Sequence, residues 1–420
     1  MAKDFKDILM DQFNKEFPDS PLEIMETSEL AQVPGWITTG NYALNWIISK
    51  DMFKGLPMGR VSVFSGDPAS GKSMVALSMM REPSIDTVIL IDTEGGGVSS
   101  QFAKFLGIDA TKVLYTTCDT IERLIAMIKK IIDNVEKNQI AKNILLVVDS
   151  ISMLSTDREV NESDKADMGN KAKQTRQFFR TYLRKMQRLN IAAIFTAHLT
   201  TNIGGYGPDK VVSGGTILGY APTLEVRFSQ VNAESVTEKS AKGASIQKIR
   251  AEIIKSRLGT KAKRVMFDLD MQTGLDPYAG IFDILRDYQI IIPGLADLDK
   301  QIEGKDIPKK SSGWWCFKPW VGTGKGEDEK TPVDTVAIHN RLIEEKLATT
   351  GKFRESQIGE WAKTIDWVLP EIQKLLDTIY QEVAQKNQEI VEEKVELEKK
   401  KSKKVKDVEA ESAAIEIKEV

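Results

Sequence analysis

The feature that most constrains this chain is the segment at residues 66–73. It reads Gly-Asp-Pro-Ala-Ser-Gly-Lys-Ser and matches the pattern G-x-x-x-x-G-K-[ST]. It follows an apolar stretch at residues 61–64 and precedes a helical pattern that begins at Met74, which is the context the pattern needs. Glycines allow backbone N–H groups to curl round phosphate oxygens, and the helix N-terminus adds partial positive charge. A chance glycine-rich turn is the alternative, and the flanking strand and helix argue against it.

Two side chains of this loop are expected to carry its chemistry. Lys72 is expected to reach the β- and γ-phosphates of a nucleotide, and the Ser73 hydroxyl is expected to hold Mg²⁺. ATP and Mg²⁺ are therefore the cofactors that the sequence predicts. The residues of this segment predicted to bind the nucleotide are Gly66, Asp67, Pro68, Ala69, Ser70, Gly71, Lys72 and Ser73.

Two acidic residues stand where such a loop needs partners. Asp149 ends the apolar stretch at residues 144–149 and is expected to bind Mg²⁺ directly or through water, with a turn residue or helix cap as the alternative. Glu94 follows the apolar stretch at residues 87–92 and precedes three glycines. Ligands of open parallel sheets bind at the carboxyl ends of strands, so Glu94 is a candidate for activating water. A solvated loop carboxylate is the alternative.

Short apolar strands alternate with longer helical patterns through the middle of the chain. This rhythm predicts an α/β fold with a mostly parallel, twisted sheet that is covered on both faces. The strands are expected at residues 61–64, 87–92, 144–149 and 191–196, and the helices at residues 121–135 and 171–189.

Both ends of the chain differ from this middle part in composition and hydrophobic pattern. Residues 3–16 carry apolar side chains at helical spacing, and the residues after about 386 are rich in Lys and Glu without aromatics. The predicted divisions are an N-terminal helix with a linker at 1–35, a nucleotide-binding core at 36–280, a small α+β domain at 281–385 and a charged tail at 386–420.

Composition excludes several classes of protein. The 420 residues include 58 Lys and Arg against 61 Asp and Glu, a net charge of −3, which excludes a strongly basic nucleic-acid coat. The two cysteines, Cys118 and Cys316, cannot form a disulfide framework or a thiolate zinc site, and they indicate a reducing compartment. No apolar run is long enough to span a bilayer. We therefore expect a cytoplasmic protein without a membrane partner.

A set of short stretches outside the phosphate loop forms a recognisable pattern. These stretches are Ile37-Thr38-Thr39-Gly40, Gly55-Leu56-Pro57-Met58-Gly59-Arg60, Ile91-Asp92-Thr93-Glu94, Leu106-Gly107-Ile108-Asp109, Asp149-Ser150, Met168-Gly169, Gly214-Gly215 and Gly274-Leu275-Asp276-Pro277-Tyr278-Ala279-Gly280. Together with the loop they resemble the RecA recombinase family, well over residues 36–285 and more loosely beyond. The last stretch looks most like the phage UvsX-like branch of that family.

The resemblance implies roles around the nucleotide. It implies a RecA-type phosphate-loop ATPase core in which Glu94 activates the attacking water. Phe102 matches an aromatic that stacks on adenine, with a core contact of its own helix as the alternative. His198 lies where family members sense the γ-phosphate; bacterial members usually carry glutamine there, and phage-type relatives carry histidine. A structural histidine beside a loop is the alternative reading of His198.

Lys255 and Arg257 follow the apolar pair Ile253-Ile254, and alternation along a strand places both on one face. The resemblance implies that this pair reaches across a subunit interface to the γ-phosphate of the neighbour's nucleotide, as an arginine finger does. An exposed basic strand edge is the alternative. The resemblance also implies that the N-terminal helix docks on the adjacent subunit, with packing against its own core as the alternative. A head-to-tail contact that does not close generates a helix.

Two segments without core patterning are candidates for contacting DNA. Residues 156–173 lead into a helix on which three basic side chains share one face, and residues 199–215 are rich in glycine. The resemblance implies apolar wedges between bases in both segments and a strand-cradling turn in the second. The predicted DNA-binding residues are Met168, Lys173, Arg176, Arg180, Ile203, Gly214, Gly215 and Thr216. Binding should be sequence-independent and salt-sensitive. Mobile loops beside a solvated basic helix are the alternative.

Three departures from bacterial relatives stand out. Gly219 replaces a lysine at an inter-subunit contact, and the tail carries a basic run at residues 399–404 where relatives are strongly acidic. The tryptophans of residues 313–320 resemble an aromatic hairpin associated with duplex DNA, or form the core of the small domain.

The sequence predicts an ATP-dependent DNA strand-exchange recombinase that forms helical filaments on single-stranded DNA and pairs it with homologous duplex. Recombination, repair and recombination-dependent replication are the expected roles, with a loader and a single-strand-binding protein as further partners. If the source is a phage, the host-cell cytoplasm is the expected location. A ring-forming helicase with the same ATPase fold is one alternative. A non-catalytic recombination mediator is the other.

Overall fold

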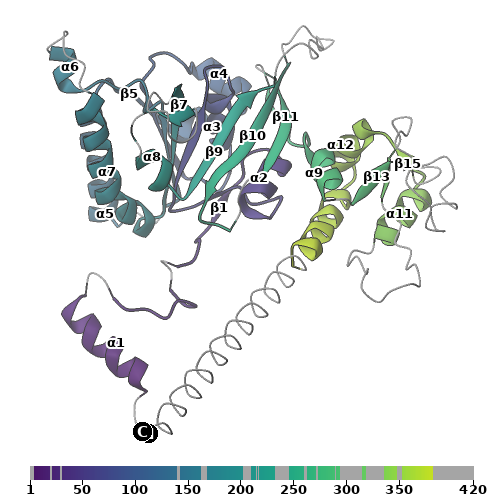
Figure 1. Cartoon of the computed structure of the whole chain (residues 1–420), viewed down its shortest axis with the longest axis horizontal. Coiled ribbons are helices and arrows are strands. Elements are labelled where there is room, and N and C mark those ends of the chain that lie inside the picture. The colour runs from purple at the N-terminus through teal and green to yellow at the C-terminus, as the bar shows by residue number, and fades with distance from the viewer. Residues whose placement is uncertain are drawn as a thin grey trace, which may run out of the picture. The chain divides into compact units, whose positions relative to one another are not determined.

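In the computed structural model the chain divides into two compact units, residues 1–281 and 282–420. A broad sheet with helices builds the first unit, and a small sheet with helices builds the second (Figure 1). No helix among the described residues is long and apolar enough to cross a membrane. The structure describes residues 4–18, 21–28, 31–139, 142–161, 168–201, 210–213, 215, 217–231, 246–259, 263–270, 273–288, 290–293, 315–317, 335–347 and 352–381. The tail predicted at residues 386–420 lies outside these ranges.

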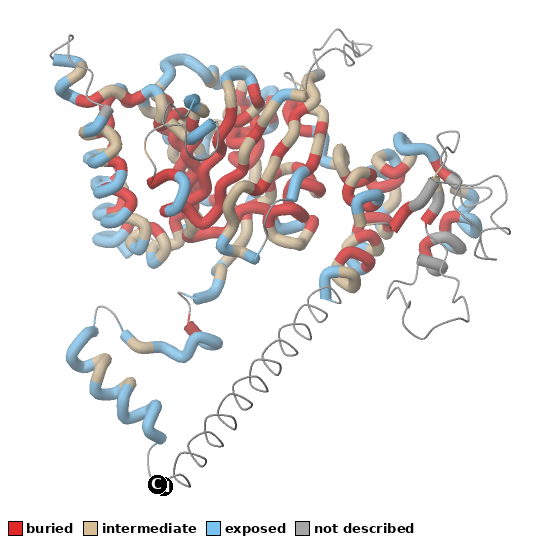
Figure 2. The backbone as a smooth tube through the Cα atoms, in the orientation of Figure 1, coloured by how far each residue is buried: buried red, intermediate tan, exposed pale blue. Residues whose placement is uncertain are grey.

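The first helix, α1 (Phe5–Glu16), forms where the amphipathic pattern predicts a helix. It buries none of its side chains, and Phe5, Ile8 and Leu9 are 73%, 41% and 44% exposed (Figure 2). In the single chain this helix therefore presents an apolar stripe to solvent.

The central sheet of the first unit confirms the predicted mostly parallel arrangement. Its strands are β3 (Val61–Gly66), β4 (Thr87–Asp92), β5 (Val113–Thr117), β6 (Ile144–Asp149), β7 (Ile191–Thr201), β9 (Leu224–Gln230), β10 (Ile246–Ser256), β11 (Arg264–Asp270) and β12 (Gly274–Leu275), with β8 (Lys210–Val212) beside β7. They follow the order β12-β11-β10-β9-β3-β7-β6-β4-β5. The run from β9 to β5 is parallel, whereas β10, β11 and β12 are antiparallel to their neighbours.

Helices and short connections complete the first unit. The helices are α2 (Tyr42–Ser49), α3 (Lys72–Met79), α4 (Ser100–Phe105), α5 (Ile121–Lys137), α6 (Asp157–Asn161), α7 (Met168–Arg188) and α8 (Ile217–Tyr220), with a 3-10 turn at Ala110–Lys112. A separate two-stranded ladder joins β1 (Trp36–Ile37) to β2 (Leu56–Pro57).

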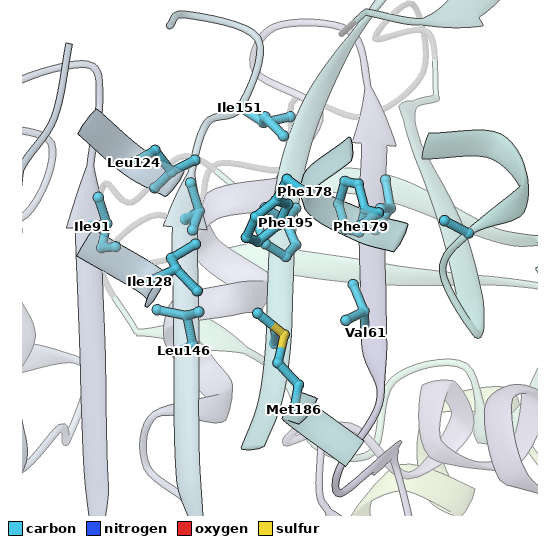
Figure 3. Close-up of a cluster of buried hydrophobic side chains, with 14 of the residues drawn as sticks. Val61, Ile91, Leu124, Ile128, Leu146, Ile151, Phe178, Phe179, Met186 and Phe195 are labelled. Carbon is cyan, nitrogen blue, oxygen red and sulfur yellow. The ribbon is translucent and has the colours of Figure 1, made fainter. Parts of the chain in front are cut away.

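The core between the sheet and helices α5 and α7 follows directly from the sequence periodicity (Figure 3). On α5, Ile121, Leu124 and Ile128 recur every three or four residues and are fully buried. On α7, Phe179 packs edge-on against Phe195 of β7, with ring centroids 5.3 Å apart. These contacts hold both helices against one face of the sheet.

The opposite face of the sheet is covered as well. Leu145 and Val147 of β6 alternate with residues of the α5–α7 core and are also buried, so they face the other way. Helix α3 contacts β7 on this side, and α2 contacts β10 and β11. Coverage of both faces explains why these strands read as continuous apolar runs.

The second unit has its own small core. A three-stranded antiparallel sheet joins β13 (Ile291–Pro293), β14 (Trp315–Phe317) and β15 (Lys352–Phe353), with α9 (Ile281–Asp287), α11 (Thr335–Glu344), α12 (Glu355–Thr364) and helical residues 368–381. Trp315 packs edge-on against Phe282, with ring centroids 5.0 Å apart. Trp315 thus serves the core of this unit. Trp314 and Trp320, the other tryptophans of the predicted aromatic segment, lie outside the described residues.

The two segments that lack core patterning are shorter than their sequence suggests. Helix α7 begins at Met168, and α6 occupies residues 157–161, so helical structure covers much of the first segment. In the second, β7 continues to Thr201 and pairs antiparallel with β8, which extends the sheet where a loop was expected. The residues that pair β7 with β8 are exposed and do not alternate between apolar and polar side chains. The hydrophobic pattern therefore did not predict this pairing.

Candidate functional site

Parallel strands end together at one edge of the sheet, and the predicted nucleotide residues meet there. In the register of the sheet Gly66 lies opposite His198, and Asp92 lies opposite Asp149. Glu94 follows Asp92 by two residues. The structure therefore brings the phosphate loop, Glu94, Asp149 and His198 to the same carboxyl edge, where open α/β sheets bind their ligands.

Two glycines of the phosphate loop are required for different reasons. Gly71 has a φ of +89°, a left-handed conformation that favours glycine, and α3 begins at the next residue. A Cβ on Gly66 would lie 2.4 Å from the carbonyl oxygen of Phe228. The loop thus turns directly from β3 into α3 and presents the helix N–H groups toward the loop.

Lys72 lies within this loop and is only 5% exposed. Its Nζ donates hydrogen bonds to the carbonyl oxygens of Gly66, at 3.1 Å, and Asp67, at 2.7 Å. Burial lowers the pKa of Lys72, while the charges of Asp149 and Glu94 oppose that shift. An ammonium group held by backbone carbonyls at the centre of the loop is placed to donate to phosphate oxygens.

Ser73 and Asp149 form an oxygen-rich pair. The Asp149 carboxylate accepts hydrogen bonds from the hydroxyls of Ser73 and Thr196. Burial raises the pKa of Asp149, and these hydrogen bonds oppose the rise. Hydroxyl and carboxylate oxygens are ligands that Mg²⁺ prefers, and the ion ordinarily completes its shell with water and phosphate oxygens. The residues present therefore fit Mg²⁺.

Glu94 stands between two polar partners at the same edge. Its Oε1 accepts a hydrogen bond from Ser150 Oγ at 3.1 Å and lies 3.4 Å from Nε2 of His198. The His198 backbone N–H donates to Ser152 Oγ at 2.8 Å. The Glu94 side chain remains 45% exposed, so water can reach it. A carboxylate that is oriented by neighbours and open to water is suited to act as a general base.

Asp92 is a site residue that the sequence reasoning missed. It is 5% exposed, and its two carboxylate oxygens accept hydrogen bonds from four consecutive backbone N–H groups, those of residues 94–97, at 2.9 to 3.2 Å. Tyr115 Oη also donates to it at 2.9 Å. These bonds outweigh burial and lower the pKa of Asp92. Asp92 thus anchors the loop that carries Glu94, and an acid before a run of glycines was the available signal.

Phe102 lies on α4, beyond the glycines that follow Glu94. Its backbone N–H donates to Ser99 Oγ at 3.0 Å, which caps the helix. Phe102 is half-buried, whereas Phe105 on the same helix is 71% exposed. Stacking of Phe102 on adenine stays a prediction.

Arg257 lies toward the opposite end of the sheet from the phosphate loop, whereas Lys255 lies nearer the middle, in register with Glu225 of β9. The Arg257 N–H donates to the Thr223 carbonyl, and the Thr223 N–H donates to the carbonyl of Val61, at the start of β3. Strand β3 has six residues and separates its ends by about 16 Å. Within one chain, Arg257 is therefore far from the loop that follows β3.

The three basic residues predicted to contact DNA lie on α7. Lys173, Arg176 and Arg180 are all exposed, and within the part of the chain that the structure describes none of them forms an ion pair. Their spacing of three and four residues places them along one side of the helix. Met168 is the first residue of the same helix.

The second DNA segment is described only at its ends. Gly215 has a φ of +105°, and a Cβ there would lie 3.1 Å from Cβ of Ala172 on α7. Lys210 of β8 forms an ion pair with Asp67 of the phosphate loop at 2.6 Å. The predicted DNA-binding residues Ile203, Gly214 and Thr216 lie outside the described residues.

The fold and this edge define the class of protein. A loop of the phosphate-binding pattern between a buried parallel strand and a helix, with a strand-end carboxylate and hydroxyl beside it, defines a phosphate-loop nucleotide-binding protein. The sequence matches the RecA N-terminal domain family over residues 5–276, more than half of the chain, and the chain therefore belongs to the RecA family. Family membership supports roles in DNA recombination and repair with ATP and DNA binding.

Similar proteins named Protein RecA occur in several bacteria. The protein of Corynebacterium efficiens is 24% identical over 335 residues, covering 79% of this chain and 77% of its own length. That of Sulfurimonas denitrificans is 23% identical over 348 residues and covers 81% of this chain and 91% of its own. That of Malacoplasma penetrans is 26% identical over 269 residues, covering 63% and 73%. The similarity thus extends through most of both chains at low identity.

Proposed function

We propose that this protein is an ATP-dependent DNA strand-exchange recombinase that forms helical filaments on single-stranded DNA and pairs it with homologous duplex. The observation that carries the proposal is the meeting of the phosphate loop, Asp149 and the Glu94–Ser150–His198 group at one edge of the sheet. These are the groups needed to bind a nucleoside triphosphate and to cleave it. Membership of the RecA family directs this chemistry to DNA recombination and repair.

Each residue of this edge has a separate task in hydrolysis. Lys72 and the loop N–H groups bind the phosphates, and Ser73 with Asp149 holds Mg²⁺, which neutralises phosphate charge when bound. Glu94 orients a water molecule and takes its proton as the water oxygen bonds to the γ-phosphorus. The bond from that phosphorus to the ADP oxygen then breaks, which releases phosphate. His198 contacts Glu94, which supports its proposed role in sensing the γ-phosphate.

The structure of one chain supports completion of this site by a second chain. Arg257 lies far from its own phosphate loop, and the neighbour's nucleotide is the target proposed for it and for Lys255 on the same strand face. The exposed apolar stripe of α1 supplies a contact surface for an adjacent subunit. A head-to-tail contact of this kind generates a helical filament.

DNA binding is assigned to the exposed face of α7 and to the segment that joins β7 to β8. The basic side chains of α7 are suited to bind DNA phosphates, which carry no information about the base sequence. Because these contacts are electrostatic, DNA affinity should fall as the salt concentration rises. The ion pair between Lys210 and Asp67 joins the end of this segment to the phosphate loop and gives DNA and nucleotide a direct connection.

The finer identity is also proposed. His198 and the stretch at residues 274–280 favour the phage UvsX-like branch, and so a role in a phage-infected host cytoplasm. A loader and a single-strand-binding protein are the partners that a filament-forming recombinase requires. Recombination-dependent replication is then among its uses.

A strand-exchange assay tests this function. The protein is incubated with single-stranded DNA, ATP and Mg²⁺ and then with a homologous or an unrelated labelled duplex. We expect transfer of the homologous strand only, and none with the Lys72→Ala variant. Transfer by Lys72→Ala at the wild-type rate would contradict the proposal, and nucleotide-dependent unwinding of a forked duplex without exchange would indicate a helicase.

A further inference from the structure

A line of polar groups crosses the interior of the sheet between the phosphate loop and Lys255. Its centre is Glu225 on β9, which is 3% exposed and lies in register with Val63 of β3 on one side and Lys255 of β10 on the other. Ser65, the residue before Gly66 of the loop, donates a hydrogen bond to Glu225 Oε1 at 3.0 Å. Glu225 is therefore held from the nucleotide side by β3.

Lys255 depends on this carboxylate. Its Nζ is buried, and among the described residues it has no hydrogen-bond partner. Burial and the charge of Arg257 lower the pKa of Lys255 to about 8, and Glu225 is the group that opposes the shift. Without Glu225, both burial and the like charge of Arg257 would lower the pKa of Lys255, and nothing would oppose them. The amine would then lose its proton near neutral pH. A neutral amine attracts phosphate far less than an ammonium does.

Glu225 has two cations near it, and Arg227 is the one that forms an ion pair with it, while none joins Glu225 to Lys255 among the described residues. Arg227, the other cation near Glu225, has Nη2 3.5 Å from Oε1, while its Nε has no partner among the described residues. A buried carboxylate is costly unless a charged neighbour compensates it.

We propose that Glu225 is a positioning residue for Lys255, and that the Ser65–Glu225–Lys255 line ties the phosphate loop of one nucleotide site to the cation that serves the next. This inference rests on the proposed function, in which Lys255 acts on the neighbour's nucleotide. Its consequence is directional: a change in the loop at one interface alters the cation presented at the following interface.

Mixed assemblies separate this role from a role in the protein's own nucleotide site. Glu225→Gln subunits keep their phosphate loop and Glu94 but present a disturbed Lys255. Glu94→Gln subunits cannot hydrolyse ATP but present an undisturbed Lys255. We expect Glu225→Gln alone to turn over ATP about tenfold to hundredfold more slowly than wild type, as for loss of a charge-assisted contact. Glu94→Gln alone should be slower by about a hundredfold to a thousandfold, as for loss of a general base. Mixing the two should restore turnover above the sum of the separate rates.

The outcomes are distinct. If Glu225 supports its own nucleotide site, mixing restores nothing, and the inference is wrong. A parallel mixture of Lys255→Ala with Glu94→Gln tests the underlying function. If turnover is restored in the Lys255→Ala mixture but not in the Glu225→Gln mixture, only the inference about Glu225 is wrong. If turnover is restored in neither mixture, Lys255 does not act on the neighbour's nucleotide.

Two further measurements distinguish the proposed role of Glu225 from a loss of turnover caused by misfolding of the Glu225→Gln variant. Ser65→Ala keeps the carboxylate and loosens it, so we expect a smaller loss of turnover that the same mixing restores. The pH profile supplies a readout that packing alone does not move. The charged groups that act on Lys255 are Glu225 on β9 and Arg257 beside it, and turnover should fall as pH rises through about 8. In Glu225→Gln this fall should move to lower pH; an unchanged profile would contradict the inference.

Discussion

Two regions of the molecule differ in how far a single chain completes them. At the carboxyl edge Lys72, Glu94 and Asp149 each have hydrogen-bond partners within the chain. Away from this edge the buried Nζ of Lys255 has no such partner among the described residues, and elsewhere in the chain the apolar stripe of α1 is exposed. The nucleotide edge is therefore preorganised, whereas Lys255 and the stripe of α1 lack such contacts within the described part of the chain.

The largest effect is expected at the preorganised edge. Lys72→Ala removes the ammonium group at the centre of the phosphate loop, so ATP turnover should fall by about a hundredfold or more. A steady-state ATPase assay with single-stranded DNA measures it. Lys54→Ala is the matched control, because Lys54 is an exposed lysine paired only with Asp51 and should turn over ATP normally. Normal turnover by Lys72→Ala would show that the loop does not serve the reaction.

Glu94→Gln should separate binding from chemistry. The amide keeps the shape and the Ser150 contact but cannot take a proton from water, so turnover should fall about a hundredfold to a thousandfold. Fluorescent-nucleotide titration and DNA gel shifts should give wild-type affinities. Loss of nucleotide affinity would instead assign Glu94 a structural role.

Asp92→Asn should weaken the preorganisation itself. An amide nitrogen cannot accept the backbone N–H groups that one carboxylate oxygen accepts, which costs about 1–3 kcal/mol of unfolding free energy. Because the pKa of Asp92 is lowered on folding, its stabilisation is present above its unfolded pKa and is lost as pH falls through the folded value. Thermal unfolding across pH should show that loss in wild type and not in the variant. Equal curves would contradict the anchoring role.

On the proposed DNA-binding face of α7, replacing a single basic residue should have a modest and measurable effect on DNA affinity. Arg176→Ala should weaken binding to all sequences alike and reduce the slope of log affinity against log salt by about one. Lys129→Ala, an exposed lysine on α5, is the control and should leave the slope unchanged. Equal slopes for both variants would place DNA elsewhere.

The smallest effect is expected from Tyr115→Phe. It removes one of five hydrogen bonds to Asp92, a loss of about 0.5–1.5 kcal/mol of unfolding free energy, with little change in turnover. Chemical denaturation measures it. A loss of unfolding free energy larger than that of Asp92→Asn would show that Tyr115, rather than the backbone N–H groups, is the main anchor of Asp92.

The sequence predicted the parts of this molecule whose signals are local. Strands β4 and β6 begin and end where their apolar runs do, and the phosphate loop and the positions of Glu94 and Asp149 follow from those strands. Contacts that depend on which residues of two strands lie opposite each other could not be predicted from the sequence. Glu225 meets Ser65 across 160 residues of sequence, and the β7–β8 ladder forms from exposed residues without alternation. The four backbone N–H groups that bind Asp92 could be identified only from the backbone geometry of the residues that follow it.

The most direct test of the account is electron microscopy of the protein with long single-stranded DNA and a slowly hydrolysed ATP analogue. If one chain completes the nucleotide site of the next, continuous helical filaments should form with the analogue and not without nucleotide. Discrete closed rings on the DNA, or filaments that form equally well without nucleotide, would contradict it.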